Sequence, residues 1–433
     1  MFAIKEAYYI YNTLSNALLK INKNGYDILI KSQSQNDEIN KNKIDNELYE
    51  ELIFRRFLTE NDRDEFLVYK AMVEGIRNSN DTMHLTVAPT MDCCFSCKYC
   101  FEKKSHSYFT NYTMDSIIGY VKKYKHIKSI HLTWFGGEPL MAIDKMQKFY
   151  NRFRPKWEKT FTSNIITTAF HITPEVIDIL KEIEVSSMQI TIDGNKDSHN
   201  KIKFIDSCDD VFSKILENID LITEKASDIR IIIRVNITKE NSKDYVGLYK
   251  SLCDRYRGKN VSITPAIVLN RGEHDDLNET SLFTKEEYVN FSVNLWNESK
   301  IGTAWTNYPD RFISECAIRN KNSLTIDSDG YVYKCWEVIG NKKHAVGRLE
   351  KGNIYDVNQI ELNRNMFGAD PLEDKNCSKC EYLPLCGGGC PIQRIENEFE
   401  NGKNNVCTTY KNHISDLLSI YLEIKTLMQQ YKN

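Results

Sequence analysis

The 433-residue chain is long enough for two or three domains, and its 41% hydrophobic content argues against wholesale disorder. Its 57 basic and 60 acidic residues leave a net charge of -3, which gives no general attraction to nucleic acid or to an anionic membrane. The sequence shows neither a basic-then-apolar start nor a run of about 18 apolar residues. We therefore expect no signal peptide and no membrane span, and a cytoplasmic protein.

The first 83 residues predict a small α+β extension. Short aromatic or aliphatic runs at 8–11 and 17–21 are typical of strands, and a polar stretch covers 31–46. A helical pattern then runs from Tyr49 to about Asn78.

From His84 the pattern becomes a regular alternation of apolar strands and amphipathic helices. Six strand–helix units in series predict an α/β fold, a partial (βα)6 TIM-like barrel over residues 84–300. Chemistry is then expected at the carboxyl ends of the strands. The predicted strands are 84–89, 130–135, 164–169, 188–192, 229–237 and 261–268, with helices at 114–124, 174–183, 211–223 and 242–256.

From about Tyr308 the sequence breaks into short segments punctuated by glycine and cysteine. This pattern predicts a loop-rich domain shaped by metal, which we assign to residues 301–433. A helix at 413–431 closes the chain.

The chain has thirteen cysteines, which in a reducing cytosol points to metal or cluster ligation rather than disulfides. Cys208 and Cys253 stand alone and are typical of buried, inert thiols. The other eleven fall in one tight group and one spaced array.

The tight group places Cys93, Cys97 and Cys100 directly after the first barrel strand. Three thiolates can hold a [4Fe–4S] cluster and leave one iron open to a small molecule. The alternative is a zinc site with a distant fourth ligand. The neighbouring Cys94 has the wrong offset, and we interpret it as a bystander.

This spacing, with an aromatic residue (Tyr99) before the last cysteine, resembles the radical S-adenosylmethionine (radical SAM) superfamily. The resemblance implies that the open iron binds S-adenosylmethionine, whose cleavage gives a 5′-deoxyadenosyl radical that abstracts a substrate hydrogen. Cys93, Cys97 and Cys100 are then the catalytic cluster ligands, and Tyr99 belongs to the cofactor site.

Three further segments resemble family motifs that contact the cofactor. Gly136-Gly137-Glu138-Pro139 follows the second strand and implies contacts to the methionine amino group. The second, Gln189-Ile190-Thr191-Ile192-Asp193-Gly194 followed by His199, implies that Thr191 contacts the methionine carboxylate, with Asp193 in the same cofactor-binding motif. The third, Arg234-Val235-Asn236 on the fifth strand, implies that Arg234 pairs with the same carboxylate. An ordinary turn and a structural ion pair are the alternatives for the glycine segment and for Arg234.

The spaced array resembles the SPASM domain, which carries two auxiliary [4Fe–4S] clusters, making three with the catalytic one. The resemblance assigns Cys316, Cys335 and Cys390 to the first and Cys377, Cys380, Cys386 and Cys407 to the second. Relatives often have a further cysteine six residues before the first ligand, where this chain has Asp310. We predict either an Asp310 ligand or an open iron there.

The combination implies a maturase that crosslinks a ribosomally made precursor peptide through a thioether, carbon–carbon or carbon–oxygen bond. One alternative is sulfatase-type oxidation of Cys or Ser to formylglycine, but Trp336-Glu337 follows Cys335 where that branch has Asp. A second is a non-catalytic iron–sulfur electron carrier. The first 83 residues are compatible with a winged-helix module that binds a leader peptide, or with a packing extension of the barrel. Expected partners are the precursor, leader plus core, and a reductant such as flavodoxin or ferredoxin.

Overall fold

The protein is described by a computed structural model in which the chain forms two compact units. The described residues are 1–4, 6–35, 38–39, 41–60, 64–79, 81–268, 279–313 and 316–430. Unit 1 comprises Met1–Arg77, Val289–Glu315 and Ala369–Asn433, and unit 2 comprises Asn78–Tyr288 and Cys316–Gly368.

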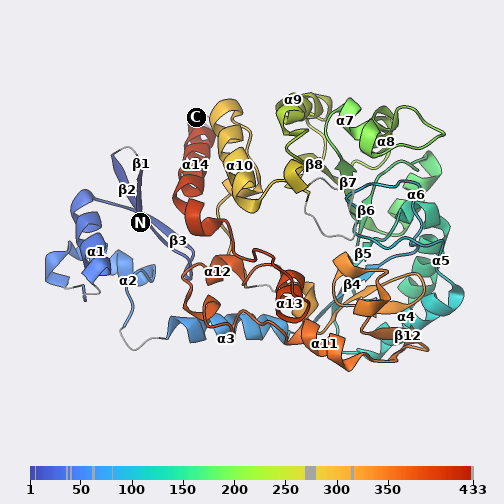
Figure 1. Ribbon diagram of the computed structural model, residues 1–433, viewed down its shortest axis with the longest axis horizontal. Coiled ribbons are helices and arrows are strands. Elements are labelled where there is room, and N and C mark those ends of the chain that lie inside the picture. Colours follow the sequence, from blue (N-terminus) through green and yellow to red (C-terminus); the bar gives the residue numbers. More distant parts are fainter. Residues whose placement is uncertain are drawn as a thin grey trace. The chain divides into compact units, whose positions relative to one another are not determined.

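Unit 2 is built on a ten-stranded sheet of order β13-β12-β11-β10-β4-β5-β6-β7-β8-β9 (Figure 1). Its six central strands run parallel and confirm the predicted barrel strands within a few residues. They are β4 (Thr82–Val87), β5 (Ser129–Trp134), β6 (Thr160–Thr167), β7 (Val185–Ile192), β8 (Arg230–Ile237) and β9 (Val261–Ile267).

Four short strands from the predicted C-terminal domain extend this sheet. The first, β10, pairs in parallel with β4, and the other three add in antiparallel order. The predicted segments 84–300 and 301–433 therefore do not coincide with the two units. The added strands are β10 (Ser323–Ile326), β11 (Tyr331–Tyr333), β12 (Gly347–Glu350) and β13 (Asn353–Tyr355).

The helices between the central strands lie along the outer side of the sheet (Figure 1). Several begin at a side chain that accepts a hydrogen bond from the helix backbone, such as Thr110, Thr173 and Asp210. The helices are α4 (Asn111–Lys123), α5 (Ile143–Phe153), α6 (Pro174–Glu182), α7 (Lys196–Ile202), α8 (Val211–Lys225) and α9 (Tyr245–Arg255), and α11 (Gln359–Met366) follows β13.

The two faces of the central sheet differ in polarity. One face carries fully buried aliphatic side chains such as Ile190 and Ile233, as expected under packed helices. On the other face, half-buried polar side chains occupy neighbouring positions: Thr133 pairs with Asn164, and Gln189 lies one strand further. The predicted site residues lie at the carboxyl ends of these strands.

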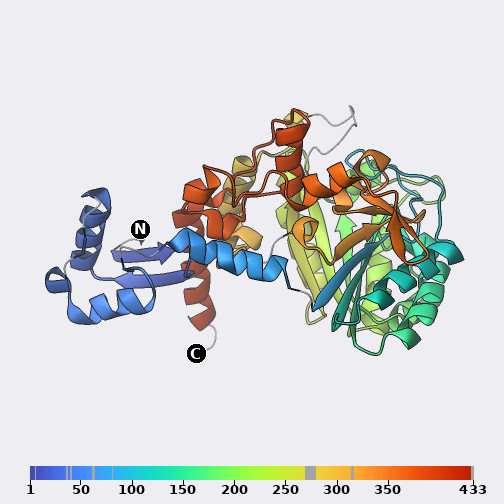
Figure 2. The same cartoon turned by 90° about the horizontal axis from the view of Figure 1, so that it is seen from below.

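Unit 1 begins with an antiparallel sheet of β1 (Phe2–Ile4), β2 (Ala7–Asn12) and β3 (Ala17–Ile21), followed by α1 (Lys23–Gln35) and α2 (Asn46–Phe54) (Figure 2). This part has a core of its own, centred on Ile10, Leu29 and Leu52. The remaining helices of unit 1 are α3 (Glu65–Arg77), α10 (Lys285–Ser299), whose first four residues lie in unit 2, α12 (Leu383–Cys386), α13 (Pro391–Phe399) and α14 (Tyr410–Gln430).

Helix α3 packs on the C-terminal part of unit 1. Tyr69 and Val73 form one buried cluster with Leu372 and Leu383, and Leu14 from the turn between β2 and β3 joins the same cluster. The Tyr69 hydroxyl also donates a hydrogen bond to the carbonyl of Phe312 at 2.9 Å.

The helical pattern predicted from Tyr49 to about Asn78 corresponds to two helices, because α2 ends at Phe54 and α3 begins at Glu65. Arg56 adopts a left-handed φ of 62°, and the N–H of Phe57 donates to the carbonyl of Leu52 at 2.7 Å. This is the geometry of a helix stop that leaves the last carbonyls satisfied. Among the described residues, no helix has the length and apolar character needed to cross a membrane.

Candidate active site

The loop after β4 is fixed by its own polar contacts before the cysteines begin. Thr90 accepts a hydrogen bond from the N–H of Asp92 at 2.9 Å and donates one to the carbonyl of Ser107 at 2.8 Å. The Asp92 carboxylate accepts from the N–H of Cys93 at 2.9 Å and from the Tyr108 hydroxyl at 3.1 Å. These hydrogen bonds fix the backbone directly before Cys93 against the segment that contains Ser107 and Tyr108.

Cys93, Cys97 and Cys100 line one cavity in unit 2. Burial raises the pKa of Cys97, and the Cys93 thiol adds to the effect; burial also raises the pKa of Cys100 to about 12, with a contribution from Cys97. Cys94 lies outside the cavity wall, where it hydrogen-bonds to Cys93 and lowers the pKa of that thiol to about 7. Within the described ranges, no three such side chains are close enough to share a single metal ion.

The turn after β5 packs directly on the cysteine loop and requires glycine. Gly136 has a φ of 93°, and a Cβ there would lie 2.5 Å from the carbonyl oxygen of Thr90. A Cβ on Gly137 would collide with the carbonyl of Asp92, which instead accepts the N–H of Glu138 at 2.8 Å. The two glycines thus let bare backbone form part of the cavity wall.

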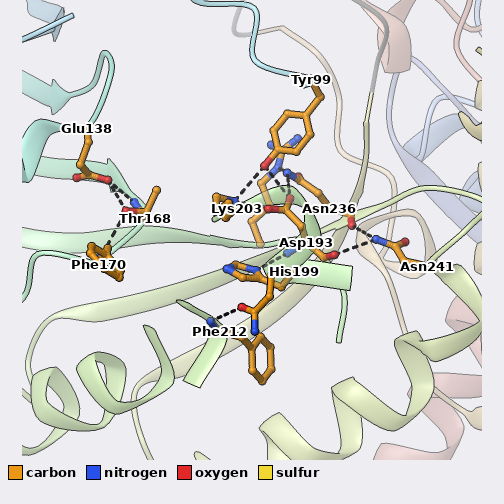
Figure 3. A network of polar contacts seen from close by, with 12 residues as sticks. Tyr99, Glu138, Thr168, Phe170, Asp193, His199, Lys203, Phe212, Asn236 and Asn241 are labelled. Atoms are coloured by element: carbon orange, nitrogen blue, oxygen red, sulfur yellow. Dashed lines mark hydrogen bonds and ion pairs between the residues drawn. The ribbon is translucent and has the colours of Figure 1, made fainter. Parts of the chain in front are cut away.

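Glu138 is fully buried and turned away from the cavity. Its Oε1 accepts from the N–H of Leu140 at 3.0 Å and from the Thr167 hydroxyl at 2.5 Å. Its Oε2 accepts from the N–H and the hydroxyl of Thr168 at 2.8 and 2.5 Å (Figure 3). The carboxylate, followed by Pro139 at the start of a short helix, therefore ties the turn after β5 to the end of β6.

A buried polar network joins the end of β7 to the cysteine loop (Figure 3). The Oδ1 of Asp193 accepts from the Tyr99 hydroxyl at 2.7 Å and from the Asn236 amide at 2.9 Å. Lys203 pairs with Oδ2 of Asp193 and donates to the Tyr99 hydroxyl at 3.0 Å. Burial is the largest single influence on Asp193 and opposes its charged form, but the Lys203 ammonium, His199 and the hydrogen bond from Tyr99 together outweigh it and lower the pKa of the carboxyl.

His199 completes this network from α7. Its Nδ1 accepts the N–H of Asp193 at 3.1 Å, and burial lowers the pKa of the imidazole to about 4. The ring is therefore neutral near pH 7 and holds the backbone at the end of β7.

Thr191 and Arg234 stand directly opposite each other on β7 and β8. Both line the cavity, and the Nε of Arg234 donates to the Asn236 amide oxygen at 3.2 Å. A hydroxyl and a guanidinium are thus presented side by side, a pair suited to a carboxylate.

The cavity measures about 300 Å³, the size of a small-molecule site. It brings together the predicted Cys93, Cys97, Tyr99, Cys100, Gly136, Gly137, Thr191 and Arg234, while Glu138, Pro139 and Asp193 lie behind its wall. Sequence reasoning missed Glu102, Lys104 and Lys203. Asn236, the last residue of the Arg234-Val235-Asn236 segment, also lines the cavity, two residues after Arg234 on the same strand face.

An aromatic stack forms one side of the cavity. The ring of Trp336 lies 5.7 Å from that of Phe135 with an 18° angle between planes, and Phe135 stacks on Phe101 at 6.4 Å. Trp336 lines the cavity and is 44% exposed.

Four of the C-terminal cysteines converge within unit 1. Burial raises the pKa of Cys386, and Cys407 and Cys380 lie close enough to add to the shift. Cys377 is affected in the same way by Cys386. The Arg394 guanidinium lies 3.5 Å from the Cys377 sulfur. The four cysteines therefore influence one another within unit 1, and their assignment to the second auxiliary cluster stays a prediction.

The set predicted for the first auxiliary cluster comes from both units. Cys316 and Cys335 belong to unit 2, where Lys334 is buried near Cys316 and donates to two backbone carbonyls at 2.6 Å. Cys390 lies at the N-cap of α13 and belongs to unit 1. The exposed Asp310 also belongs to unit 1. This ligand set stays a prediction.

Residues 87–252 match the Radical SAM superfamily. The serine-type anaerobic sulfatase-maturating enzyme of Klebsiella pneumoniae is 23% identical over 365 residues, covering 78% of this chain and 87% of that protein. The radical SAM cyclopropyl synthase TigE of Paramaledivibacter caminithermalis is 21% identical over 438 residues, covering 93% and 85%.

Two solved structures share the fold. Native anSMEcpe with bound AdoMet and Cp18Cys peptide aligns with a TM-score of 0.58 at 17% identity, covering 79% of this chain and 99% of that one. Streptococcus suis SuiB bound to precursor peptide SuiA aligns with a TM-score of 0.52 at 12% identity, covering 93% and 98%.

Proposed function

The chain is a radical SAM enzyme of the peptide-modifying SPASM type, related over most of its length to the sulfatase-maturating enzymes and to TigE, and we propose that it crosslinks a ribosomally made precursor peptide. The observation that carries the proposal is the cavity. It places three thiols, a glycine-only turn and a hydroxyl–guanidinium pair around one space of about 300 Å³.

The residues around the cavity fit a [4Fe–4S] cluster and S-adenosylmethionine. Cys93, Cys97 and Cys100 are soft ligands for the cluster, and Thr191 and Arg234 suit the methionine carboxylate. When bound, the cluster and S-adenosylmethionine supply a 5′-deoxyadenosyl radical that takes a hydrogen atom from the substrate. The residues of the cavity wall hold and orient the cluster and the cofactor.

The second auxiliary cluster is supported by the convergence of Cys377, Cys380, Cys386 and Cys407 in unit 1. For the first we propose Cys316, Cys335 and Cys390 with Asp310 or an open iron. Together with the catalytic cluster, these account for three [4Fe–4S] clusters, which require an external reductant such as flavodoxin or ferredoxin.

Trp336 favours a peptide whose side chain packs in the cavity. Its exposed indole offers a flat apolar surface beside the cluster thiols, and rings of this kind commonly anchor bound side chains. Formylglycine formation is a second candidate, favoured by the likeness to the Klebsiella enzyme, and would be recognised by an aldehyde on the product. The match of residues 87–252 favours either enzyme over an iron–sulfur carrier.

Replacing Trp336 with alanine should raise the KM for the precursor peptide by about 10- to 30-fold, because losing an aromatic anchor that the bound peptide covers costs this much binding. The measurement is peptide modification by mass spectrometry with a precursor found among neighbouring reading frames. Trp336→Phe should restore most of the affinity. Phe367→Ala, which removes a 71% exposed ring after α11, is the matched control and should change nothing. An unaltered KM for Trp336→Ala would exclude the indole from peptide binding.

The N-terminal sheet supports a leader-binding role, since β1 and β3 are both edge strands of a three-stranded sheet. The structure also shows where a test deletion should end. Removing α3 would strip Tyr69 and Val73 from the cluster that contains Leu372 and Leu383, whereas residues 1–58 have their own core.

Deleting residues 1–58 should weaken precursor binding by about tenfold or more while leaving peptide-free cofactor cleavage intact, because the lost edge strands supply backbone hydrogen bonds to the leader. Fluorescence anisotropy of a labelled precursor measures the affinity, and the same peptide without its leader is the control. Wild-type affinity in a well-folded truncation contradicts leader binding. Loss of bound iron or of the folded state would instead identify the region as packing support.

A further inference from the structure

The loop that carries the catalytic cysteines turns positive charge to the solvent. Lys103 and Lys104 follow Cys100 closely in the sequence, and both side chains are exposed. The Lys104 ammonium is directed to the carbonyl of Phe95 in the same loop. The outer side of the cysteine loop is therefore cationic.

A second segment of unit 2 packs directly against this loop. Gly340 has a φ of 80°, and a Cβ there would lie 2.6 Å from the carbonyl oxygen of Lys103. Ile339 forms a buried cluster with Met91, and Phe101 packs against that cluster. The cysteine loop and the segment around Gly340 therefore form one continuous surface.

This second segment adds cations that an aromatic ring holds in place. The Nζ of Lys342 lies 4.6 Å from the centroid of the Tyr331 ring, and the guanidinium carbon of Arg348 lies 5.4 Å from it. Cations are attracted to the face of such a ring. Glu350 lies 3.6 Å from Arg348 and offsets part of its charge. Two cations thus share one ring beside the cysteine loop.

Cations outnumber acidic groups on this surface, whereas the chain as a whole has a net charge of -3. The acidic side chains beside it are the exposed Asp329, the Glu350 already described, and Asp92, which is bonded to His106 and Tyr108. The excess of positive charge is therefore local, and such a patch attracts an acidic partner. We call it the lysine surface, made of Lys103, Lys104, Lys342, Lys343 and Arg348.

The position of the lysine surface indicates which acidic partner it fits. The proposed function needs an electron from outside the protein, and this surface borders the loop that holds Cys93, Cys97 and Cys100. Beneath it, Phe101 follows Cys100 in the chain and stacks on Phe135 at 6.4 Å. A negatively charged electron carrier matches both the charge of the surface and its place beside the catalytic cysteines.

We propose that the lysine surface docks an acidic one-electron carrier protein of the flavodoxin or ferredoxin class. The carrier is oxidised by one electron, and the cluster held by Cys93, Cys97 and Cys100 is reduced by one. The inference rests on the proposed function, because that function creates the need for the electron.

The test is calorimetric binding of oxidised flavodoxin, and separately of oxidised ferredoxin, to the full-length reconstituted enzyme, so no turnover is needed. Lys103→Glu combined with Lys342→Glu should weaken binding by about tenfold or more at low ionic strength, because like charges then face each other. Lys243→Glu combined with Lys250→Glu makes the same charge change at exposed positions of the segment before α9 and of α9 itself. This control should bind as the wild-type protein does.

Formation of 5′-deoxyadenosine separates docking from damage to the catalytic site. The Lys103/Lys342 variant should lose rate with subsaturating reduced flavodoxin and keep the wild-type rate with dithionite, a small reductant that needs no docking surface. In the wild-type protein the flavodoxin-driven rate should fall as salt rises, since the screening length is only about 10 Å at 0.1 M.

Unchanged carrier affinity in the Lys103/Lys342 variant, an equal loss in the control, or no binding of either carrier to the wild-type protein overturns the docking surface. If the variant does not load iron, Lys342→Glu combined with Arg348→Glu replaces it, because this pair leaves the cysteine loop intact; the same selective loss is then required. Absence of 5′-deoxyadenosine from wild-type protein with dithionite overturns the proposed function itself, and this result does not depend on any carrier.

Discussion

Alanine at Cys97 is expected to abolish reductive cleavage of S-adenosylmethionine, whereas alanine at Cys94 leaves it nearly intact. Cys97 lines the cavity with Cys93 and Cys100, and a cluster left with two thiolates has no third soft ligand there. Cys94 is outside the wall and reaches the site only through its hydrogen bond to Cys93. Formation of 5′-deoxyadenosine with dithionite, followed by chromatography, measures the effect.

Iron content separates loss of one cluster from loss of the fold. Three four-iron clusters correspond to about twelve irons per chain, and a Cys93/Cys97/Cys100 triple alanine variant should retain about eight. Zinc in place of iron, or about four irons in the wild-type protein, would contradict the auxiliary clusters. A Cys94 variant that loses the catalytic cluster, with a Cys97 variant that keeps it, would show that the ligands are misassigned.

Replacing Lys203 with methionine should lower the free energy of unfolding of unit 2 by about 3–5 kcal/mol, because it leaves the Asp193 carboxylate buried without its cation. Lys203 and Asp193 are 2% and 1% exposed. Since iron–sulfur proteins rarely unfold reversibly, the practical measurement is the apparent Tm at a fixed scan rate, with an expected fall of about 6–20 °C.

The exposed pair of Arg257 and Asp254 provides the matched control. Arg257→Met removes a cation in the same way, but the pair is largely solvated and is worth about 1 kcal/mol at most. Adding Asp193→Asn to Lys203→Met should recover part of the loss, because the uncompensated charge is removed. If Lys203→Met melts with the wild-type protein, Asp193 does not depend on this ion pair.

The sequence predicted the central strands well because their apolar runs are long and continuous, as in β8, where one face and part of the other are buried. It did not predict β10 to β13, which have three or four residues each and derive their order from pairing with β4. Local pattern carries little information about such short strands, whose partners are distant in sequence.

The sequence also predicted only some of the residues of the candidate site. Cysteine spacing and the glycine pair identified residues that do line the cavity, because both depend on local backbone geometry. Lys203 and Glu102 were invisible, since a lone charged side chain becomes significant only when the fold buries it. Glu138 was found by motif, yet three of its four contacts come from Thr167 and Thr168, a segment that no sequence pattern links to it.

The segments of unit 1 leave the ribosome far apart in time. Strands β4 to β9 emerge consecutively and can pair as they appear, together with the cysteine loop that follows β4. Helix α3 emerges before all of them, but Leu372 and Leu383, which bury its Tyr69 and Val73, follow about 300 residues later. The segments that carry Cys377, Cys380, Cys386 and Cys407 also follow the barrel strands along the chain. The central strands and the cysteine loop after β4 can therefore fold during translation before the core around α3 is completed.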